Sequence, residues 1–238
     1  MIDGLRVLAV VPARSGSKGI PNKNMRQLAG TSLIGWTGRT LARVPAIDRR
    51  VISTDSADYA REAERHGLEA PFLRPRELSG DTAGAIDTLQ HALREMEARV
   101  GELFDVVLIV EPTSPFRLPS DIELILRRLV STGADSVVAV SALPTKSHPH
   151  KVHTLSHGRL GFYEDAGRSI VARQQLQELY YRNGVCYALT RRCLVEQRTV
   201  FGAHCEAEIT THPVINIDEP WELEWAEFQL GRGAFRLE

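Results

Sequence analysis

The sequence predicts an α/β fold in which a mostly parallel, doubly wound sheet lies between two layers of helices. Three observations predict it: an ordinary globular composition, short apolar runs that alternate with segments of helical period, and an unbroken aliphatic run at residues 106–110. The 238 residues are 43% hydrophobic and 25% charged, which excludes a disordered chain. An aliphatic run without alternation is typical of a strand covered on both faces, as in a parallel sheet.

Strands and helices alternate through the first half of the chain. The predicted strands are at residues 5–11, at 51–55 and near Phe72. The predicted helices are at residues 32–44, 56–66 and 82–100. Gly67 ends the second of these helices, and apolar residues at steps of three and four give the third a single buried stripe. This order predicts parallel strands joined by right-handed crossovers.

The second half continues this order and then departs from it. Strands are predicted at residues 106–110, 136–140, 180–189 and 214–217. Helices are predicted around residues 122–129 and at 219–230, the latter with Trp221, Trp225 and Phe228 on its buried face. Between the middle strands, residues 144–177 are rich in His, Gly, Ser and Arg and have weak periodicity. We therefore expect one domain over residues 1–238, with an inserted arm at about 144–177.

Cysteine usage and hydropathy predict a cytoplasmic protein. Cys186, Cys193 and Cys205 have no paired spacing, which favours reduced thiols over a disulfide framework. No apolar run approaches the roughly 18 residues of a membrane span. The formal net charge of −1 lacks the basic excess of a non-specific nucleic-acid binder, so we expect neither a nucleic-acid nor a membrane partner.

Charge segregation marks the loop that follows the first strand. No Asp or Glu occurs between Asp3 and Asp48, whereas this stretch contains seven cations: Arg6, Arg14, Lys18, Lys23, Arg26, Arg39 and Arg43. In open α/β sheets, ligands bind beyond the carboxyl ends of strands, where residues 12–24 (PARSGSKGIPNKN) are expected. Glycine backbone N–H groups, serine hydroxyls and cations together suit a triphosphate. The alternative is a solvated Gly/Ser turn, and neither the P-loop nor the dinucleotide-binding pattern is present.

Oxygen-bearing side chains follow other predicted strands at the same edge of the sheet. They occur in residues 53–56 (STDS), 112–117 (PTSPFR) and 216–218 (NID). If residues 214–217 form a strand, its period of two places Asn216 and Asp218 on one side, as suits a Mg²⁺ ion that retains water and substrate phosphates as ligands. The alternative is that Asp218 caps the terminal helix, with Pro220 in its first turn.

Residues 11–24 (VPARSGSKGIPNKN) resemble the signature loop of the acylneuraminate cytidylyltransferases, the CMP-sialic acid synthetase family. Further motifs match that family in chain order: residues 53–56 (STDS), 73–75 (LRP) with 81–83 (DTA), 111–117 (EPTSPFR), 173–176 (RQQL), 183–184 (NG) with Tyr187, and 216–218 (NID). The resemblance implies a three-layer α/β fold of the nucleotide-diphospho-sugar transferase type with a small dimerisation arm. It implies a homodimer in which the arm reaches the active site of the partner subunit.

The resemblance also implies a Mg²⁺-dependent enzyme that joins CMP from CTP to a 2-keto acid sugar, a sialic acid or related nonulosonic acid, and releases pyrophosphate. It implies that Arg14, Lys23 and Asp218 are catalytic and that Asp218 and Asn216 hold the metal. The implied CTP-binding residues are Arg14, Ser15, Gly16, Ser17, Lys18, Lys23, Asn24, Arg74, Asp81, Thr82 and Ala83. The implied sugar-binding residues are Glu111, Thr113, Ser114, Lys151, Arg173, Asn183 and Tyr187.

Two positions depart from the pattern of that family. Asn216 stands where the family carries the first Asp of Asp-x-Asp, and Glu111 stands where it carries Gln. The extra carboxylate favours a sugar with an amine or additional hydroxyls, so we predict a substrate other than plain N-acetylneuraminic acid. Two alternatives stay open. One is a related transferase for an eight-carbon acid sugar or another nucleotide, and the other is a degenerate member that binds CTP for regulation.

Overall fold

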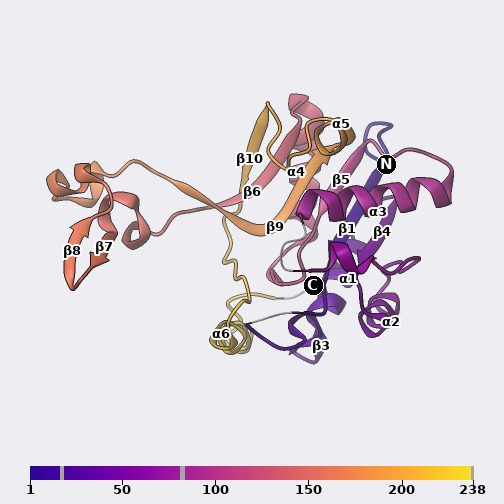
Figure 1. Cartoon of the computed structure of the whole chain (residues 1–238), viewed down its shortest axis with the longest axis horizontal. Coiled ribbons are helices and arrows are strands. Elements are labelled where there is room, and N and C mark those ends of the chain that lie inside the picture. Colours follow the sequence, from indigo (N-terminus) through magenta and orange to yellow (C-terminus); the bar gives the residue numbers. More distant parts are fainter. Residues whose placement is uncertain (17–18, 81–83, 237–238) are drawn as a thin grey trace.

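The computed structural model describes residues 1–16, 19–80 and 84–236, and its centre is one six-stranded sheet (Figure 1). In the order in which they lie in the sheet, the strands are β10 (Cys205–Ile209), β6 (Ser136–Ala142), β9 (Tyr180–Thr190), β5 (Val106–Ile109), β1 (Val7–Pro12) and β4 (Arg49–Ser53). β1 pairs in parallel with β4 and β5, and β6 with β10, while β9 runs antiparallel to both of its neighbours. The predicted mostly parallel sheet is confirmed.

Helices cover both faces of this sheet. They are α1 (Leu33–Ala42), α2 (Ala57–Arg65), α3 (Ala85–Val100), α4 (Pro119–Thr132) and α5 (Arg191–Val195), while α6 (Pro220–Gly231) packs on a separate apolar cluster beside the sheet. Alternate residues of β1 point to opposite faces: Val7, Ala9 and Val11 pack with α1, α2 and α4, whereas Leu8 and Val10 pack with α3 and α5. The result is the predicted three-layer arrangement, with a core on each side of the sheet.

Local capping chemistry sets the ends of these helices. Ser32 accepts a hydrogen bond from the Gly35 N–H at 2.9 Å at the start of α1, and Ser56 accepts one from the Tyr59 N–H at 3.4 Å at the start of α2. Gly101 and Gly133 end α3 and α4 in the left-handed conformation, with φ of 72° and 63°. These signals explain why the predicted helix positions are close to the observed ones.

Two predicted strands are absent from the described residues. Near Phe72 there is only a single bridge, between Val51 and Glu69. Residues 214–217 cross the ends of the sheet as irregular chain, where Ile217 N–H donates to the Thr113 carbonyl at 2.8 Å. One outer strand of the sheet is β10, which was not predicted because its sequence is polar. In it, Glu206 and Glu208 alternate with less polar residues, and Glu208 accepts from Arg128 at 2.6 Å.

The prediction for the terminal helix was wrong about which side is buried. Trp221, Trp225 and Phe228 are 62%, 49% and 50% exposed. The buried residue is Ala226, and Leu223 and Leu230 pack beside it against the cluster that contains Phe116 and Ile217. A small residue at the contact lets α6 lie close to the core, so its large aromatic rings face outward.

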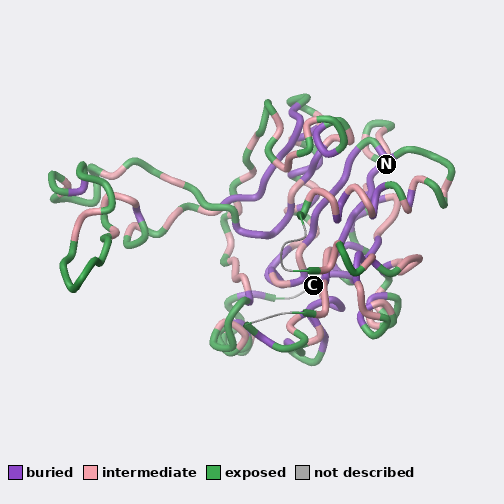
Figure 2. The backbone as a smooth tube through the Cα atoms, viewed as in Figure 1, coloured by how far each residue is buried: buried purple, intermediate pink, exposed green. Residues whose placement is uncertain are grey.

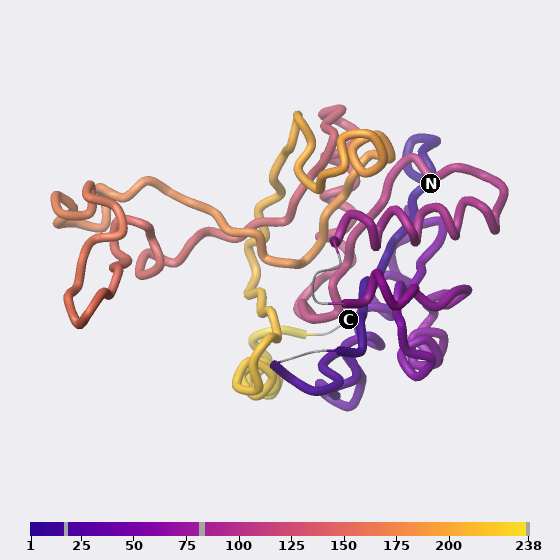
Figure 3. Tube along the Cα trace, viewed as in Figure 1, coloured from indigo at the N-terminus to yellow at the C-terminus, as the bar shows by residue number. Residues whose placement is uncertain are grey.

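Residues 143–179, between β6 and β9, leave the core as an extended excursion that we call the arm (Figures 1 and 3). Its end carries a hairpin of β7 (His153–Ser156) and β8 (Arg159–Phe162), and most of the excursion is exposed or half-buried (Figure 2). Its 3₁₀ turns are η3 (Thr145–Ser147), η4 (Pro149–Lys151), η5 (Asp165–Ser169) and η6 (Arg173–Gln175). Large apolar residues on it face solvent, with Leu155, Leu160 and Val171 exposed by 73%, 68% and 89%.

The remaining short elements surround the first loop and the chain before α3. They are η1 (Lys23–Met25), β2 (Gln27–Leu28), β3 (Thr31–Ser32) and η2 (Arg76–Leu78), and β2 and β3 form a two-stranded antiparallel sheet. Within the described ranges, no helix has the length and apolar character needed to cross a membrane.

Candidate active site

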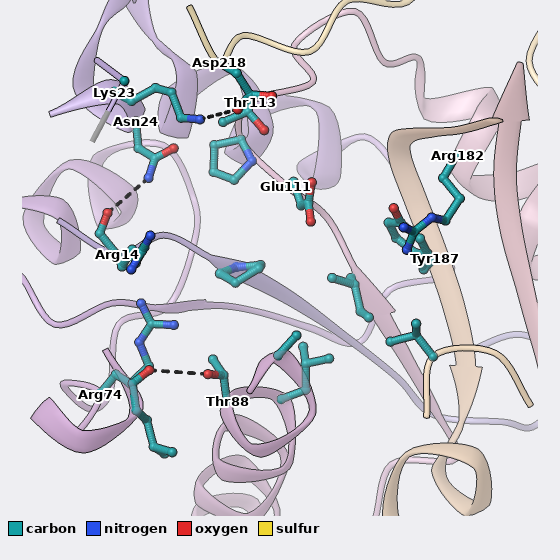
Figure 4. A pocket seen from close by; sticks show the side chains of 18 of the residues that line it. Arg14, Lys23, Asn24, Arg74, Thr88, Glu111, Thr113, Arg182, Tyr187 and Asp218 are labelled. Atoms are coloured by element: carbon teal, nitrogen blue, oxygen red, sulfur yellow. Dashed lines mark hydrogen bonds and ion pairs between the residues drawn. The ribbon is translucent and has the colours of Figure 1, made fainter. Parts of the chain in front are cut away.

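A cavity of about 670 Å³ opens where β1 and β5 end, at the edge of the sheet where the sequence predicts a ligand site. Eight of the predicted site residues line it: Arg14, Lys23, Asn24, Arg74, Glu111, Thr113, Tyr187 and Asp218 (Figure 4). Arg14 follows β1, Glu111 follows β5, and Tyr187 comes from β9. The volume lies within the range of about 300–1,000 Å³ that is usual for sites of small ligands.

At one end of the cavity, two buried side chains have hydrogen-bonding groups without partners. Arg74 is 7% exposed, and its Nε and Nη2 donate to no acceptor among the described residues. Asn24 is 5% exposed; its amide donates to the Arg14 carbonyl at 3.4 Å, and its Oδ1 has no donor in the described part of the chain. Burial lowers the pKa of Arg74, as does the positive charge of Arg14, while Asp55 opposes the effect. Buried polar groups without hydrogen-bond partners reduce the stability of a folded protein, and a ligand that bonds to them removes this cost.

Asp55 fixes the start of the cationic loop. Its carboxylate accepts from both the backbone N–H and the hydroxyl of Ser15, each at 2.9 Å. Burial on its own raises the pKa of Asp55, but the bonds from Ser15 and the charge of Arg74 outweigh it, and the pKa lies below its ordinary value. The Ser15 hydroxyl is thus used within the loop, and neither Ser15 nor Gly16 is among the residues that line the cavity.

Lys23 and Asp218 join the first loop to a segment far along the chain. Lys23 Nζ lies 2.6 Å from Asp218 Oδ1, and the Lys23 side chain is 17% exposed. Gly19 also touches this segment, because a Cβ on it would lie 2.6 Å from the Asp218 carbonyl oxygen. Only glycine permits that approach, so the loop and Asp218 are held together at the mouth of the cavity.

Asn216 and Asp218 do not lie together as a pair of ligands. Asn216 Oδ1 accepts from the Ser114 hydroxyl and lies beside Gly184, where φ is +72° and a Cβ would be 2.8 Å from it. The alternative role of Asp218 as a helix cap is also not observed: Glu219 is the N-cap of α6, and Glu222 accepts from the Asp218 N–H at 2.7 Å.

The donor set at the mouth of the cavity fits a hydrated divalent ion. No group of three or more His, Cys, Asp and Glu suited to a metal occurs in the ranges that the structure covers. The Asp218 carboxylate is 68% exposed and faces the cavity beside Lys23. One carboxylate that can be joined by phosphate oxygens and water is a coordination that Mg²⁺ adopts and that Zn²⁺ sites rarely use.

The opposite end of the cavity is formed by Glu111, Arg182 and Tyr187. Burial raises the pKa of Glu111; the charge of Asp218 raises it further, and Arg117, Lys23 and Arg182 oppose this. Burial also raises the pKa of Tyr187, with Glu111 adding to the effect. The Arg182 guanidinium lies over the Phe201 ring, 5.2 Å from its centroid.

Sequence reasoning missed Arg182. Tyr187 and Arg182 are an odd number of residues apart on β9, so an even strand would point them to opposite faces. The pairing of β9 with β6 shifts register between Val138 and Val140, and this irregularity lets both side chains reach the cavity. The left-handed Gly184 between them is the signal in the sequence that could have revealed it.

The other predicted residues lie beneath the cavity, on the arm, or outside the described residues. Asn183 is fully buried and donates to Ser141 Oγ at 3.0 Å and Thr210 Oγ1 at 2.9 Å. Ser114 is also fully buried. Lys151 and Arg173 are on the arm, in η4 and η6. The predictions for Ser17, Lys18, Asp81, Thr82 and Ala83 fall on positions outside the described ranges.

The buried Arg117 supports the loop that carries Glu111. It is 2% exposed and donates to the backbone carbonyls of Glu111 at 2.6 Å and Val185 at 2.5 Å. Burial lowers its pKa to about 10. The guanidinium thus ties β5 to β9 behind the cavity. Cys186 is fully buried beside it, and burial raises its pKa to about 12.

The chain is similar to known proteins over most of its length. Residues 8–208 match the family model described as "Cytidylyltransferase". The chain is 31% identical over 231 residues to CMP-N,N'-diacetyllegionaminic acid synthase of Legionella pneumophila, covering 93% of this chain and 94% of that protein. It is 27% identical over 223 residues to an N-acylneuraminate cytidylyltransferase of Escherichia coli, covering 93% of this chain and 51% of that protein.

A solved structure has the same fold. CMP:2-keto-3-deoxy-manno-octonic acid synthetase complexed with CTP superimposes with a TM-score of 0.70 at 16% identity, covering 96% of this chain and 99% of that one. The match to the family model spans the sheet from β1 to β10 and includes the loops that follow β1 and β5. The chain therefore belongs to the cytidylyltransferase family, and it is a nucleotidyltransferase.

Proposed function

We propose that this protein transfers CMP from CTP to a nine-carbon 2-keto acid sugar, a sialic acid or related nonulosonic acid, and releases pyrophosphate. The observation that carries the proposal is the buried Arg74, which lines the cavity and whose Nε and Nη2 have no acceptor in the described structure. A ligand with carbonyl and hydroxyl oxygens, such as cytidine, satisfies these donors. Asn24 beside it supplies an amide oxygen and an amide N–H for the same nucleoside.

The triphosphate then extends from Arg74 toward Arg14 and Lys23. Transfer of a nucleotidyl group needs alignment of the attacking oxygen with the α-phosphorus and positive charge for the departing pyrophosphate. Arg14 and Lys23 supply that charge from the first loop, and we infer that Ser17 and Lys18 contribute from the same loop. A Mg²⁺ ion held by Asp218 and phosphate oxygens supplies further charge and polarises the phosphates when it is bound.

The sugar lies at the end formed by Glu111, Arg182 and Tyr187, with Thr113 between it and the phosphates. The Arg182 guanidinium suits the carboxylate of a 2-keto acid sugar. Glu111 accepts from hydroxyl or amide N–H groups, which supports a substrate richer in such donors than plain N-acetylneuraminic acid. The diacetylated sugar in the name of the Legionella pneumophila relative has that character.

We further propose a homodimer that acts in the cytoplasm. The exposed apolar residues of the arm, among them Leu155 and Leu160, support a protein contact. In such a dimer Lys151 and Arg173 reach the cavity of the partner and complete the sugar end. Three free cysteines, Cys186, Cys193 and Cys205, support a reducing compartment. Light scattering after gel filtration tests the dimer, and a single monomeric species would contradict it.

The experiment that tests the function is pyrophosphate release from CTP and Mg²⁺ with a panel of nine-carbon and eight-carbon 2-keto acid sugars. We expect release that requires CTP and one nine-carbon sugar and is lost in Arg14→Ala and Asp218→Ala. Preference for an eight-carbon sugar would change the assigned substrate. Tight binding of CTP without release for any sugar would favour a regulatory protein that binds the nucleotide without turnover.

A further inference from the structure

Glu111 lies at the boundary between the two halves of the cavity. It is the second residue after β5, and Figure 4 shows its carboxylate between the Lys23–Asp218 pair on one side and Arg182 with Tyr187 on the other. Its electrostatic coupling to Lys23, Asp218 and Arg182 agrees with this position. In the proposed reaction, the sugar hydroxyl meets the α-phosphate at this boundary.

The carboxylate of Glu111 also lacks a hydrogen-bond or ion-pair partner among the described residues. Its backbone carbonyl accepts from Arg117, but within the described structure its side chain makes no hydrogen bond or ion pair. Of the other carboxylates that line the described cavity, Asp218 is paired with Lys23 at 2.6 Å, and Glu219 is an exposed residue at the N-cap position of α6. No histidine is among the residues that line the described cavity.

We propose that Glu111 is the general base that removes the proton from the attacking hydroxyl of the sugar, an inference that rests on the function proposed above. The O–H bond of the anomeric hydroxyl breaks, and its proton moves to the Glu111 carboxylate. The freed oxygen bonds to the α-phosphorus as the bond from that phosphorus to the bridging oxygen breaks, and the electron pair leaves on pyrophosphate. No additional reactant is needed.

The surroundings of Glu111 strengthen it as a base. Burial holds the pKa of Glu111 above its ordinary value, so its carboxylate binds a proton more strongly than one in water. Arg117, Lys23 and Arg182 oppose this, and Tyr187 faces it as a neutral hydroxyl with a raised pKa. A glutamine at this position, as in the family pattern, can hold a sugar but cannot accept a proton.

The test is the pH dependence of single-turnover pyrophosphate release at saturating CTP, Mg²⁺ and sugar, in the wild-type protein, Glu111→Gln and Glu111→Asp. We expect Glu111→Gln to lower the rate by about 10²–10⁴-fold and to abolish the loss of rate at acid pH. Glu111→Asp retains a carboxylate, so it should keep the acid limb at a lower rate. Glu123→Gln, a change of a half-buried carboxylate that pairs with Arg127 on α4 and does not line the cavity, is the matched control and should leave the rate and profile unchanged.

Binding of CTP, measured by calorimetry, serves as the test of folding and should be the same in all four proteins. A Glu111→Gln variant that keeps the wild-type rate and acid limb, or that changes only KM for the sugar, would overturn the role as base and leave the proposed function intact. A wild-type protein that binds CTP but turns over no acid sugar would overturn both. An acid limb that persists in Glu111→Gln would assign the proton acceptor elsewhere.

Discussion

The two ends of the cavity are built in different ways. The end proposed to bind the nucleotide has buried side chains, Arg74 and Asn24, with polar groups that lack partners in the described structure. The end proposed to bind the sugar is more open: Arg182 is exposed, Tyr187 is half-buried, and Lys151 and Arg173 lie on the arm. Buried residues suit a substrate that does not vary, whereas exposed and distant residues can be replaced more easily when the sugar changes.

The largest effect is expected at the nucleotide end. Arg74→Met removes two buried donors without a large loss of volume, and hydrogen bonds from charged groups are each worth about 1.5–3 kcal/mol, so CTP affinity should fall by at least about 100-fold. Calorimetric titration with CTP measures it. Arg94→Met, on the exposed side of α3, is the control. Equal affinity in both variants would show that the nucleotide binds elsewhere.

Arg182→Met should affect the sugar alone. Loss of one charged contact to the sugar carboxylate predicts an increase in KM for the sugar of about 10-fold, with CTP affinity unchanged. Steady-state pyrophosphate release with varied sugar gives KM, and calorimetry gives the affinity for CTP. If CTP binding weakened as well, the two ends of the cavity would not be independent.

Substitution of Asp218 should change the affinity for Mg²⁺ more than substitution of Asn216. Because the Asn216 amide oxygen is held by Ser114, Asn216→Asp should change the Mg²⁺ concentration for half-maximal activity little. Asp218→Asn should raise it by about 10-fold or more. Binding of Mn²⁺ in the presence of CTP, followed by electron paramagnetic resonance, should rank the two variants in the same order of metal affinity without requiring turnover. A large gain in Asn216→Asp would make position 216 a true ligand site.

The smallest effect concerns the loop that Asp55 fixes. The pKa of Asp55 is lower in the folded protein than its ordinary value, so its stabilisation is complete above the unfolded pKa and is lost as pH falls through the folded pKa. The difference in unfolding free energy between wild type and Asp55→Asn should therefore shrink as the solution is acidified. Urea titrations over a series of pH values measure it. If this difference in unfolding free energy did not change with pH, the hydrogen bonds from Ser15 would not depend on the negative charge of Asp55.

Features that depend on local sequence could be predicted, whereas features that depend on contacts between distant segments could not. The cationic loop could be located because a stretch without acidic residues is visible in the sequence, and the position of the helices because their caps are local. The strand β10 and Arg182 could not be located, since one is a polar edge strand and the other depends on a register shift against a strand over 40 residues away. The aromatic rings of α6 face outward because a small residue packs against the core. The helical spacing of apolar residues does not specify which face of the helix makes that contact.

The position of β9 has a consequence for synthesis of the chain on the ribosome. This strand lies between β5 and β6, yet it is made after both of them and after the whole arm. Until residue 190 emerges, the nascent sheet is split, and β5 and β6 each present an unpaired apolar edge to other chains. Chains that stall in the arm should therefore aggregate, while chains released after β9 close the sheet from within.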